Sequence, residues 1–539
     1  MGVEKPVQDA VVRAMASLCP LPRVAERLQG RVGRMLVAAR LFVSPRAYSR
    51  LVVSAAVLPA PAEALALLLL PLAQAALIVG GLAALQASPV LALLSRSNAR
   101  RRATDAELPF FLMTLSVFVR GSEPTLQEGF RRVAAIGPRV FPGFHGEAEL
   151  LARDDAFVPG SPVGVAERAF SGHPSARLRA FVQGFLKTLA TGKDAAEFLA
   201  QETSFQVQRL EQSWAGFAAS VGSLAEVTFI VLALFPVGLE MVGAAVTGFT
   251  SSPLFLASFA LVAVAAAVFL LLMDAMQPVV YDTPPSAVWL SLSLSSWALS
   301  AAGYAAGALT AGECGLVPVC VSALGFYRSR ARYSRVRRGE VEVGAMLHEL
   351  AEESKAGVAL PDAVSRLAAR AGAFPSIGEP VLAFYQSTRL GLTPTEAQRR
   401  VDHPSWLVRL GFGILSIAFE TGAGFEHLEE LSALFRRVAD ARKGVAQSMV
   451  PFVLVGAIVP VISVAAATFL SGFAQAGAAA LPGFAVQESR ASLVLSVSTV
   501  SALSGVLLSK LLTQTVRHEV ALPLLMASTL ASLLAFGVA

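Results

Sequence analysis

Long apolar stretches alternate with two polar, charge-rich blocks along this chain. Lys and Arg are absent from 51–95, 210–327 and 444–489, and from every position after Arg517. A helix needs about 20 consecutive apolar residues to cross the hydrocarbon core of a bilayer. The apolar stretches therefore predict membrane-spanning helices, and the blocks between them predict water-facing helices.

Turn-forming residues divide the apolar stretches into about nine predicted spans. Their predicted order is a hairpin at 51–95, four helices at 214–327 and three helices at 448–539. The polar blocks, 105–212 and 341–443, are then predicted to lie on one side of the membrane. We therefore predict an all-α polytopic membrane protein with two homologous helical-bundle domains in the cytoplasm, its N-terminus inside and its C-terminus outside.

The first polar block predicts a set of short helices. Apolar periodicity on both sides of Gly121, with Pro124 close by, predicts a helical hairpin. Gly and Pro are frequent in 137–164, which predicts a loop. Helices are predicted to resume near Arg177.

Two similar decamers occur in the two polar blocks. Residues 126–135 have the sequence LQEGFRRVAA, and residues 360–369 have LPDAVSRLAA. They share the first Leu, an acidic third residue, a small fourth residue, an Arg at the seventh position and a final Ala-Ala pair. One such pair can arise by chance in an Ala-rich chain, so a prediction of duplication depends on further matches in the same order.

Three further landmarks repeat in that order. Each half has a glycine about ten residues after an apolar pair, then a Thr-Gly pair, then a proline in the first span that follows. The residues are Gly121, Gly192 and Pro236 in the first half and Gly357, Gly422 and Pro460 in the second. The order predicts two copies of a unit made of two spans, a cytoplasmic helical block and two more spans, with one extra span at the end.

Composition favours a membrane protein over a soluble one. A chain of 539 residues suggests roughly three or four soluble domains by length alone. Hydrophobic residues make up 55% of it and charged residues 15%, and the mean hydropathy is +0.61. This balance is typical of a polytopic membrane protein and overrules the length.

The net charge of +6 arises largely from basic clusters beside the predicted spans. Basic residues near span ends are retained on the cytoplasmic side during insertion. One cluster, at 328–338, is therefore predicted to be a basic linker that anchors the chain at the cytoplasmic face rather than a nucleic-acid site. Its members are Arg328, Arg330, Arg332, Arg335, Arg337 and Arg338.

The N-terminal segment 1–50 is basic, contains several prolines and lacks the short apolar core of a cleaved signal peptide. Within it, 23–41 has apolar residues at helical spacing interleaved with Arg. This pattern is typical of an amphipathic helix at the cytoplasmic membrane surface, and a solvated lead-in segment fits it equally well.

No catalytic or cofactor motif occurs in the sequence. GxxxxGK[ST], HExxH and GxSxG are absent, so we expect neither an ATPase nor another enzyme, and no cofactor. The three cysteines form no CxxC pair and support neither a zinc site nor a disulfide framework. Glu349, Glu352 and Glu353 lie on one predicted helix, where a solvated face is favoured over a metal or catalytic cluster.

Carboxylates within the predicted spans are the more unusual feature. Glu226 and Glu240 are 14 residues apart on one span, which places them within about 40° of each other. Carboxylates are unfavourable in hydrocarbon and normally face protein or water. Glu226 and Glu240 both lie near the ends of their predicted helix, where a carboxylate can reach water, and this position explains their presence. The functional alternative is a polar stripe that guides a partner helix or binds a proton or ion. Pro236 and Pro460 would kink their helices, as in a packing groove or a moving element.

At these residues the chain resembles the type II secretion system F domain family. This family contains the polytopic platform proteins of type II secretion, type IV pili, Tad pili and the archaellum. Residues 108–112, LPFFL, followed by Arg120-Gly121, are similar to the opening helix and turn of that domain. Four spans between the blocks resemble the archaeal members.

The second half carries a further likeness to the family. Glu420 and Gly422, followed by Leu428, resemble its signature of an acidic residue and a glycine before a Leu-rich helix. Ala190 stands at the acidic position in the first block, so the signature is degenerate there.

The resemblance implies a non-enzymatic platform in the cytoplasmic membrane. It implies that the cytoplasmic blocks, the second above all, dock a hexameric secretion ATPase, and that the membrane helices hold pilin or archaellin subunits. Membrane lipids and a second copy in a homodimer are further expected partners, and nucleic acid is not. The candidate docking or signature residues are the four glycines named above, Glu420 and the arginines of 328–338.

A secondary transporter with internal repeats and intramembrane carboxylates is the alternative, because repeats and broken helices suit both classes. The two classes differ in where the repeated signal lies. It is clearest in the polar blocks here, whereas a transporter would carry it in the spans.

Overall fold

A computed structural model describes most of the chain. The described residues are 20–41, 43–69, 72–119, 126–157, 162–229, 253–422, 424–480 and 490–535. Within these ranges the chain forms helices joined by turns and contains no β-strand, which confirms the all-α prediction. The chain splits into two compact units, Met1–Gln206 and Val207–Ala539, and each is described by itself.

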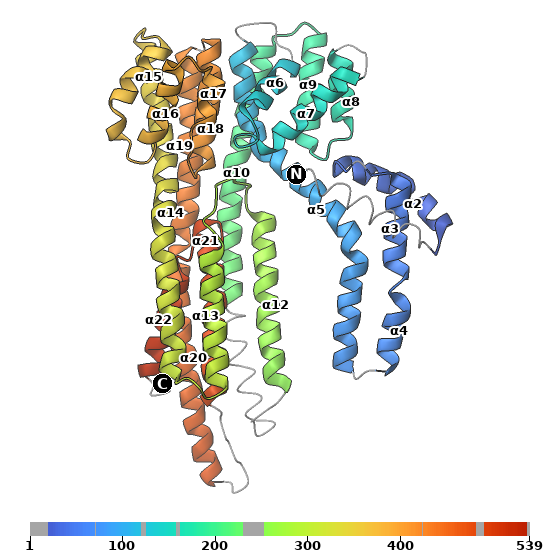
Figure 1. The fold of residues 1–539 in the computed structure, drawn as a ribbon, viewed down its shortest axis with the longest axis vertical. Coiled ribbons are helices and arrows are strands. Elements are labelled where there is room, and N and C mark those ends of the chain that lie inside the picture. The colour runs from blue at the N-terminus through green and yellow to red at the C-terminus, as the bar shows by residue number, and fades with distance from the viewer. Residues whose placement is uncertain are drawn as a thin grey trace. The chain divides into compact units, whose positions relative to one another are not determined.

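Helices follow one another through the first unit with short connections (Figure 1). In chain order they are α2 (Pro22–Ala38), α3 (Pro45–Val57), α4 (Ala60–Leu69), α5 (Leu72–Val119), α6 (Leu126–Ile136), α7 (Pro142–Phe157), α8 (Pro162–Ser171), α9 (Ala176–Ala190) and the start of α10 (Ala195–Phe229). The longest, α5, has 48 residues and runs without interruption from a predicted span into the first polar block.

Phenylalanine side chains form the core of the first polar block. Phe111 of α5 stacks on Phe144 of α7 with ring centroids 4.4 Å apart. Phe130 of α6 lies 4.8 Å from Phe111 and 5.1 Å from Phe170 of α8, again between centroids. All four rings are buried. Because each buried ring removes a large apolar area from water, these contacts hold α5 to α8 together.

One segment of this block differs from the sequence-based prediction. The stretch 137–164, predicted as a loop, contains α7 and the beginning of α8. Pro142 and Pro162 are the first residues of these helices, where proline is tolerated because its missing N–H would have no intrahelical partner. The loop prediction is therefore wrong, because these prolines begin helices instead of interrupting them.

A helix is present where the amphipathic pattern of 23–41 predicts one. On α2, Val32 and Leu36 are buried and pack with Tyr48 of α3 and Leu93 of α5. The apolar face of α2 is therefore covered in part within the first unit, whereas Val24 and Val37 are exposed. The arginines of α2 lie on its exposed side.

The second unit contains the longer list of helices. After α10 come α12 (Pro253–Met276), α13 (Val288–Ala305), α14 (Ala311–Lys355), α15 (Leu360–Ala369), the 3-10 turn η2 (Ala371–Ala373), α16 (Gly378–Arg389), α17 (Pro394–Arg399), α18 (Trp406–Thr421), α19 (Phe425–Ser448), α20 (Val450–Ala480), α21 (Arg490–Thr513) and α22 (Leu522–Ala535).

The helix α14 is continuous over 45 residues. It begins with a capping box in which Thr310 and Glu313 bond each other's backbone N–H groups. The basic run 328–338, predicted as a basic linker, lies inside this helix. That run contains neither Gly nor Pro and is rich in Arg, a good helix former, so nothing ends the helix there. The linker is therefore a rigid connection between an apolar segment and the second polar block.

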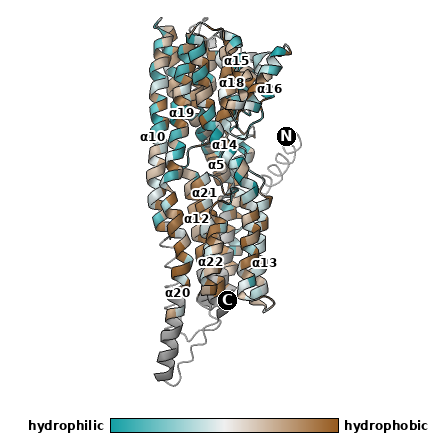
Figure 2. Cartoon of the chain, turned by 90° about the vertical axis from the view of Figure 1, so that its left-hand side faces the viewer, coloured by the Kyte–Doolittle hydropathy of each residue, from teal (hydrophilic) through white to brown (hydrophobic). Residues whose placement is uncertain are grey.

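Apolar side chains of the second unit gather toward one end. Figure 2 shows hydrophobic residues on α12, α13, α20 and α22 and hydrophilic residues toward α15 and α19. Buried Phe217, Met273, Met449 and Leu507 belong to one apolar cluster, which joins α10, α12, α21 and the start of α20. The helices α15 to α18 lie at the other end, and α14 and α19 run between the two ends (Figure 1).

Two helical stretches among the described residues are long and apolar enough to cross a membrane. They are Pro45–Ala66 in the first unit and Phe425–Ala465 in the second. Shorter apolar helices occupy Val262–Met276, Val497–Thr513 and Leu522–Ala535. By their length and composition, these helices are consistent with membrane association.

Candidate functional site

Three charged side chains meet where the polar and apolar ends of the second unit join. Glu340 is on α14, Arg442 is on α19, and Asp282 lies between α12 and α13. Arg442 donates through Nη1 to Glu340 and through Nη2 to Asp282, the latter at 2.7 Å. The side chains of Glu340 and Arg442 are 1% and 4% exposed. One guanidinium therefore ties together three separate parts of the chain, and we call these three residues the ionic junction.

Burial and charge act in opposite directions in the ionic junction. Burial raises the pKa of Glu340 to about 7; Arg442 counteracts this effect, and the negative Asp282 adds to it. For Arg442, burial alone would lower the pKa, but the attraction of Asp282 and Glu340 is larger and raises it. Arg442 therefore stays charged. For Glu340 burial is the largest effect, so its pKa stays raised in spite of Arg442.

A second arginine fastens the Asp282 segment to α18. Arg409 Nη1 donates to Thr283 Oγ1 at 2.8 Å, and Nη2 donates to the carbonyl oxygen of Tyr281 at 2.6 Å. Asp282 Oδ1 accepts from the backbone N–H of Trp406, the first residue of α18, at 2.7 Å. A carboxylate is stabilised at a helix N-terminus by free N–H groups and by the helix dipole. This short segment is thus held to the polar block on two sides.

A glutamate holds a backbone turn in each polar block. In the first block, Glu107 on α5 accepts from the backbone N–H groups of positions 143 and 144, each at 2.8 Å. In the second, Glu342 on α14 accepts from the N–H groups of positions 376 and 377, at 2.9 and 3.0 Å. Both turns follow a Phe-Pro pair, at 141–142 and 374–375. The two blocks therefore use the same residue types for the same contact.

A His-Pro-Ser tripeptide begins a buried helix in each block. His173 Nδ1 accepts from the N–H of Ser175 at 3.0 Å, and His403 Nδ1 accepts from the N–H of Ser405 at 3.1 Å. Ser175 then caps α9 and Ser405 caps α18, each by accepting from the N–H three residues on. Each tripeptide begins 19 residues before a left-handed glycine, at 192 and 422. This equal spacing extends the repeat beyond the decamers.

The two histidines have different neighbours at Nε2. His173 Nε2 lies 3.5 Å from Glu147, which also pairs with Arg100 at 2.6 Å. Burial alone would raise the pKa of Glu147, but hydrogen bonds from Arg100 and His173 lower it to about 2. His403 Nε2 instead lies 3.3 Å from Ser376 Oγ, and burial lowers the pKa of His403 to about 4. The histidine of the tripeptide therefore lies beside the ionised carboxylate of Glu147 in the first block. In the second block a neutral histidine lies beside the hydroxyl of Ser376.

The helices of the two blocks follow the same order. Helices α6, α7, α8, α9 and α10 of the first block correspond in turn to α15, α16, α17, α18 and α19 of the second. No protein-family model, curated protein or solved structure matches the chain. The similarity between the two blocks is therefore a comparison made within the chain.

Described signature residues lie at helix ends. Gly192 and Gly422 have φ of +64° and +67° and follow α9 and α18, and Gly357, with φ of +86°, follows α14. Glu420 accepts from the N–H of Thr395 at 3.2 Å and so holds the start of α17. These contacts assign Gly192, Gly357, Gly422 and Glu420 a part in folding the blocks. The remaining signature residue, Gly121, lies outside the described residues.

The arginines of 328–338 divide into two groups. Arg335 pairs with Glu379 at 2.8 Å, and Arg332 and Arg337 are partly buried. The exposed members are Arg328, Arg330 and Arg338. These three side chains are therefore the solvent-exposed members of the cluster.

The acidic residues of α14 lie against α15. Glu349 pairs with Arg370 at 2.7 Å, and Glu353 pairs with Arg366 at 2.9 Å. No group of His, Cys, Asp or Glu that could hold a metal occurs in the part of the chain that the structure describes. The acidic face therefore joins two helices in addition to meeting solvent.

The candidate residues of the apolar helices are only partly described. Glu226 is exposed on α10, and Pro460 is buried within α20. Ser528 of α22 donates to the carbonyl oxygen of Ala457, close to the backbone bond that Pro460 removes. Pro236 and Glu240 lie outside the described residues. The polar stripe of Glu226 and Glu240 thus stays a prediction.

The ionic junction has no sequence signal of its own. Asp282 and Arg442 are 160 residues apart, and neither belongs to a motif. The His-Pro-Ser repeat differs in this respect, because the tripeptide occurs at 173–175 and 403–405 with equal spacing to the following glycine. A search for short identical strings at a fixed offset would have found it.

Proposed function

We propose that this chain is a platform protein of the type II secretion system F domain family. It would anchor a hexameric secretion ATPase and couple it to the assembly of pilin or archaellin subunits. The observation that carries the proposal is the pair of polar blocks with the same helix order and the same Glu and His-Pro-Ser contacts. A platform with two similar cytoplasmic domains requires such a pair.

The proposed topology has about nine helices crossing the cytoplasmic membrane, with both blocks in the cytoplasm. The apolar stretches and the basic clusters beside them support this arrangement. The hydrophobic helix of a filament subunit would pack among the membrane helices, with lipids around them. A second copy of the chain would complete a homodimer.

Two long helices offer a route by which movement of the ATPase reaches the membrane. α14 is unbroken from 311 to 355, and α19 is separated from α20 by Met449 alone. The ionic junction joins both helices to the Asp282 segment. Breaking a buried ion pair leaves an uncompensated charge, so the junction resists separation of these parts. A displacement at the polar end is therefore passed to the apolar helices.

The exposed arginines of α14 are the proposed docking surface for the ATPase. Arg328, Arg330 and Arg338 are exposed and lie between the apolar start of α14 and the second polar block. Exposed charges of one sign steer an oppositely charged partner and fix its orientation. We therefore expect an acidic face on the ATPase.

The transporter alternative has less support from the described acids. Asp274 pairs with Lys510, and Glu313 belongs to the capping box of α14. An acid that is bound to a fixed partner stabilises the fold and is poorly placed to exchange ions. No described contact favours ion coupling over the platform.

The docking surface is tested with full-length protein in detergent and the secretion ATPase of the same cell. Reversing three charges, with Arg328→Glu, Arg330→Glu and Arg338→Glu together, should weaken capture of the ATPase by roughly tenfold or more. Removal of the whole second block is a poorer test, because α14 and α19 also carry the ionic junction.

The matched control reverses three exposed arginines on α2, which lies outside both polar blocks. These are Arg23, Arg27 and Arg31. The control should capture the ATPase as the unaltered chain does. Equal capture of the ATPase by the unaltered chain, the α14 variant and the α2 control would contradict the proposed docking surface. No capture by the unaltered chain would overturn the platform function.

A further inference from the structure

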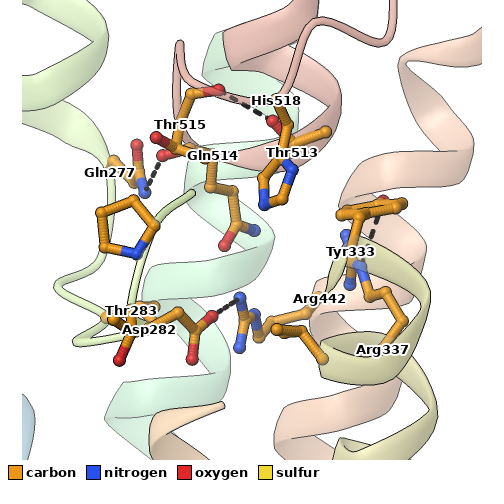
Figure 3. Close-up of a pocket in the computed structure, with 13 residues that line it drawn as sticks. Gln277, Asp282, Thr283, Tyr333, Arg337, Arg442, Thr513, Gln514, Thr515 and His518 are labelled. Atoms are coloured by element: carbon orange, nitrogen blue, oxygen red, sulfur yellow. Dashed lines mark hydrogen bonds and ion pairs between the residues drawn. The ribbon is translucent and has the colours of Figure 1, made fainter. Parts of the chain in front are cut away.

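A polar cavity of about 230 Å³ lies beside the ionic junction. Its wall consists of the segment 277–284, one face of α14, part of α19 and the turn 513–518 between α21 and α22. Figure 3 shows Arg442, Gln514 and His518 pointing toward the space between these elements. The cavity is therefore enclosed by polar and apolar parts of the second unit together.

Several buried polar atoms on this wall have no hydrogen-bond partner among the described residues. They are Nε2 and Oε1 of Gln514, Nδ1 of His518 and Nε of Arg442. His518 is only 5% exposed. A buried polar atom without a partner costs about 1–3 kcal/mol. A bound molecule, or water, is therefore expected to meet these atoms.

The backbone of Gln514 has an unusual conformation. Its φ is +63°, and its carbonyl oxygen accepts from Gln277 Nε2 at 3.1 Å. A residue with a Cβ is disfavoured in this left-handed region by about 1–2 kcal/mol. Such conformations cluster at binding sites, where the surrounding structure holds them in place. Here the strain places the Gln514 amide on the cavity wall.

The charged groups on the wall favour an anion. The wall carries two arginines, Arg337 and Arg442, and one carboxylate, Asp282. Glu340 contacts both arginines but is not part of the wall, so the groups that face the cavity are mainly cationic. Arg337 is held by Tyr333, whose hydroxyl oxygen accepts from Nε at 3.2 Å, and its Nη1 forms a long ion pair of 4.0 Å with Glu340. Because 4.0 Å is beyond hydrogen-bond distance, the Nη groups keep donors for a ligand. Burial lowers the pKa of His518 to about 4, so its ring is neutral and can accept or donate.

The size and position of the cavity favour a small phosphate-bearing group. Its volume is below the range of about 300–1,000 Å³ that is usual for drug-sized ligands. Leu511 and Ala521 beside the turn belong to the apolar cluster, and the apolar helix α12 ends at Met276. In the proposed topology this level corresponds to the cytoplasmic lipid headgroups, whose phosphates are bound by basic side chains.

We propose that this cavity binds a phosphoryl oxyanion, with Arg337 and the Gln514 amide as its donors and an anionic phospholipid headgroup as its source. The lipid source rests on the membrane topology of the proposed function. A free phosphate has the same chemistry and is distinguished by experiment. The bound anion would bridge α14 and the turn before α22, next to the ionic junction.

The test has two arms, both with the full-length chain. In the first, protein is released from bilayers of equal phosphatidylglycerol and phosphatidylcholine, and the retained lipid is counted by native mass spectrometry. In the second, inorganic phosphate is added to delipidated protein and the melting temperature is measured. Gln514→Gly removes the amide and suits the left-handed backbone, so this variant should fold. Arg337→Gln removes the charge, and Lys355→Gln is the exposed control on the same helix.

The unaltered chain and Lys355→Gln should retain phosphatidylglycerol in preference to phosphatidylcholine. Arg337→Gln should bind it about tenfold more weakly or worse, as expected for one lost charge-assisted hydrogen bond, and Gln514→Gly should also weaken retention. A phosphate-induced rise in melting temperature without retained lipid, lost in Arg337→Gln, supports the anion site with free phosphate as its source.

Equal lipid retention by Arg337→Gln, Gln514→Gly and the unaltered chain would overturn the proposal. Binding of neither lipid nor phosphate would also overturn it and leave a cavity filled with water. Capture of the ATPase does not enter these readouts, so a failure of the proposed function can be told apart from a failure of this site.

Discussion

Replacing Arg442 with Gln should destabilise the second unit strongly. The substitution removes the guanidinium that pairs with both Glu340 and Asp282 and leaves a shorter, uncharged polar side chain. Asp282 then loses the cation with which it pairs, and Glu340 keeps only the more distant Arg337, whose Nη1 is 4.0 Å away. Glu340 is almost fully buried, so water cannot replace the lost partner.

The size of the effect follows from burial. Removing one partner of a buried ion pair costs about 3–5 kcal/mol, because the remaining charge is uncompensated. Every 1.4 kcal/mol corresponds to a factor of about ten, so local opening should become roughly a hundredfold to a few thousandfold more frequent. The cost should be smaller at pH 6 than at pH 8, because Glu340, with its pKa near 7, is then already largely protonated.

Hydrogen exchange of the backbone amides in α14 and α19 measures this opening directly. Arg437→Gln is the matched control on the same helix. Arg437 pairs with Glu211 at 3.3 Å, but its side chain is 60% exposed, and exposed pairs contribute at most about 1 kcal/mol. The control should therefore change exchange by less than about fivefold.

A second substitution separates the charge from the loss of packing. In the double variant Glu340→Gln with Arg442→Gln, the uncompensated carboxylate on α14 is gone, so part of the lost protection should return. If Arg442→Gln exchanged like Arg437→Gln, or if the double variant were no better than the single one, buried charge would not be what holds these helices together.

Two further predictions concern pH and packing. The pKa of Glu340 is raised to about 7 from an ordinary 4.5, so α14 and α19 should become less stable as pH rises from about 4.5 to 7. The pKa of Glu147 is lowered to about 2, so the first block should become less stable as pH falls from 4.5 to 2. Exchange measured against pH in each block checks both directions, and Glu340→Gln or Glu147→Gln should flatten the corresponding profile. A Cβ on Gly339 would lie 2.6 Å from the ring of His403, so Gly339→Ala should lower the free energy of unfolding by about 1–3 kcal/mol. Gly444 has no atom within contact distance of such a Cβ, so Gly444→Ala should raise the free energy of unfolding by about 0.5–1 kcal/mol, as measured by thermal unfolding. Equal melting temperatures for the two alanine variants would contradict the packing described around His403.

The sequence was most informative about helices and least informative about their ends. Apolar periodicity and the absence of charge predicted helical segments because both are local properties of the chain. The stretch 137–164 was predicted wrongly because proline at the first turn of a helix looks the same, in sequence, as proline in a loop. The basic run 328–338 was predicted as a basic linker from its charge, and its helix propensity lets α14 continue through it.

The contacts that join the segments depended on folding and could not be predicted. Asp282, Glu340 and Arg442 come from three distant segments, and a charged residue at a helix surface is ordinarily solvated, so no local pattern marks these as buried. The two decamers fared better, since each begins at the first residue of its helix, α6 or α15. Local repeats are visible in one sequence, and long-range pairing is not.

The two helical blocks of like construction are proposed to face the cytoplasmic side of one membrane. Arg131→Cys and Leu390→Cys place one probe in each block, at side chains that are 80% and 76% exposed, in a chain whose own three cysteines are replaced. A membrane-impermeant maleimide should label neither probe on intact cells and both probes once the membranes are opened. Labelling of either probe on intact cells would place that block outside the cytoplasm and contradict the proposed topology.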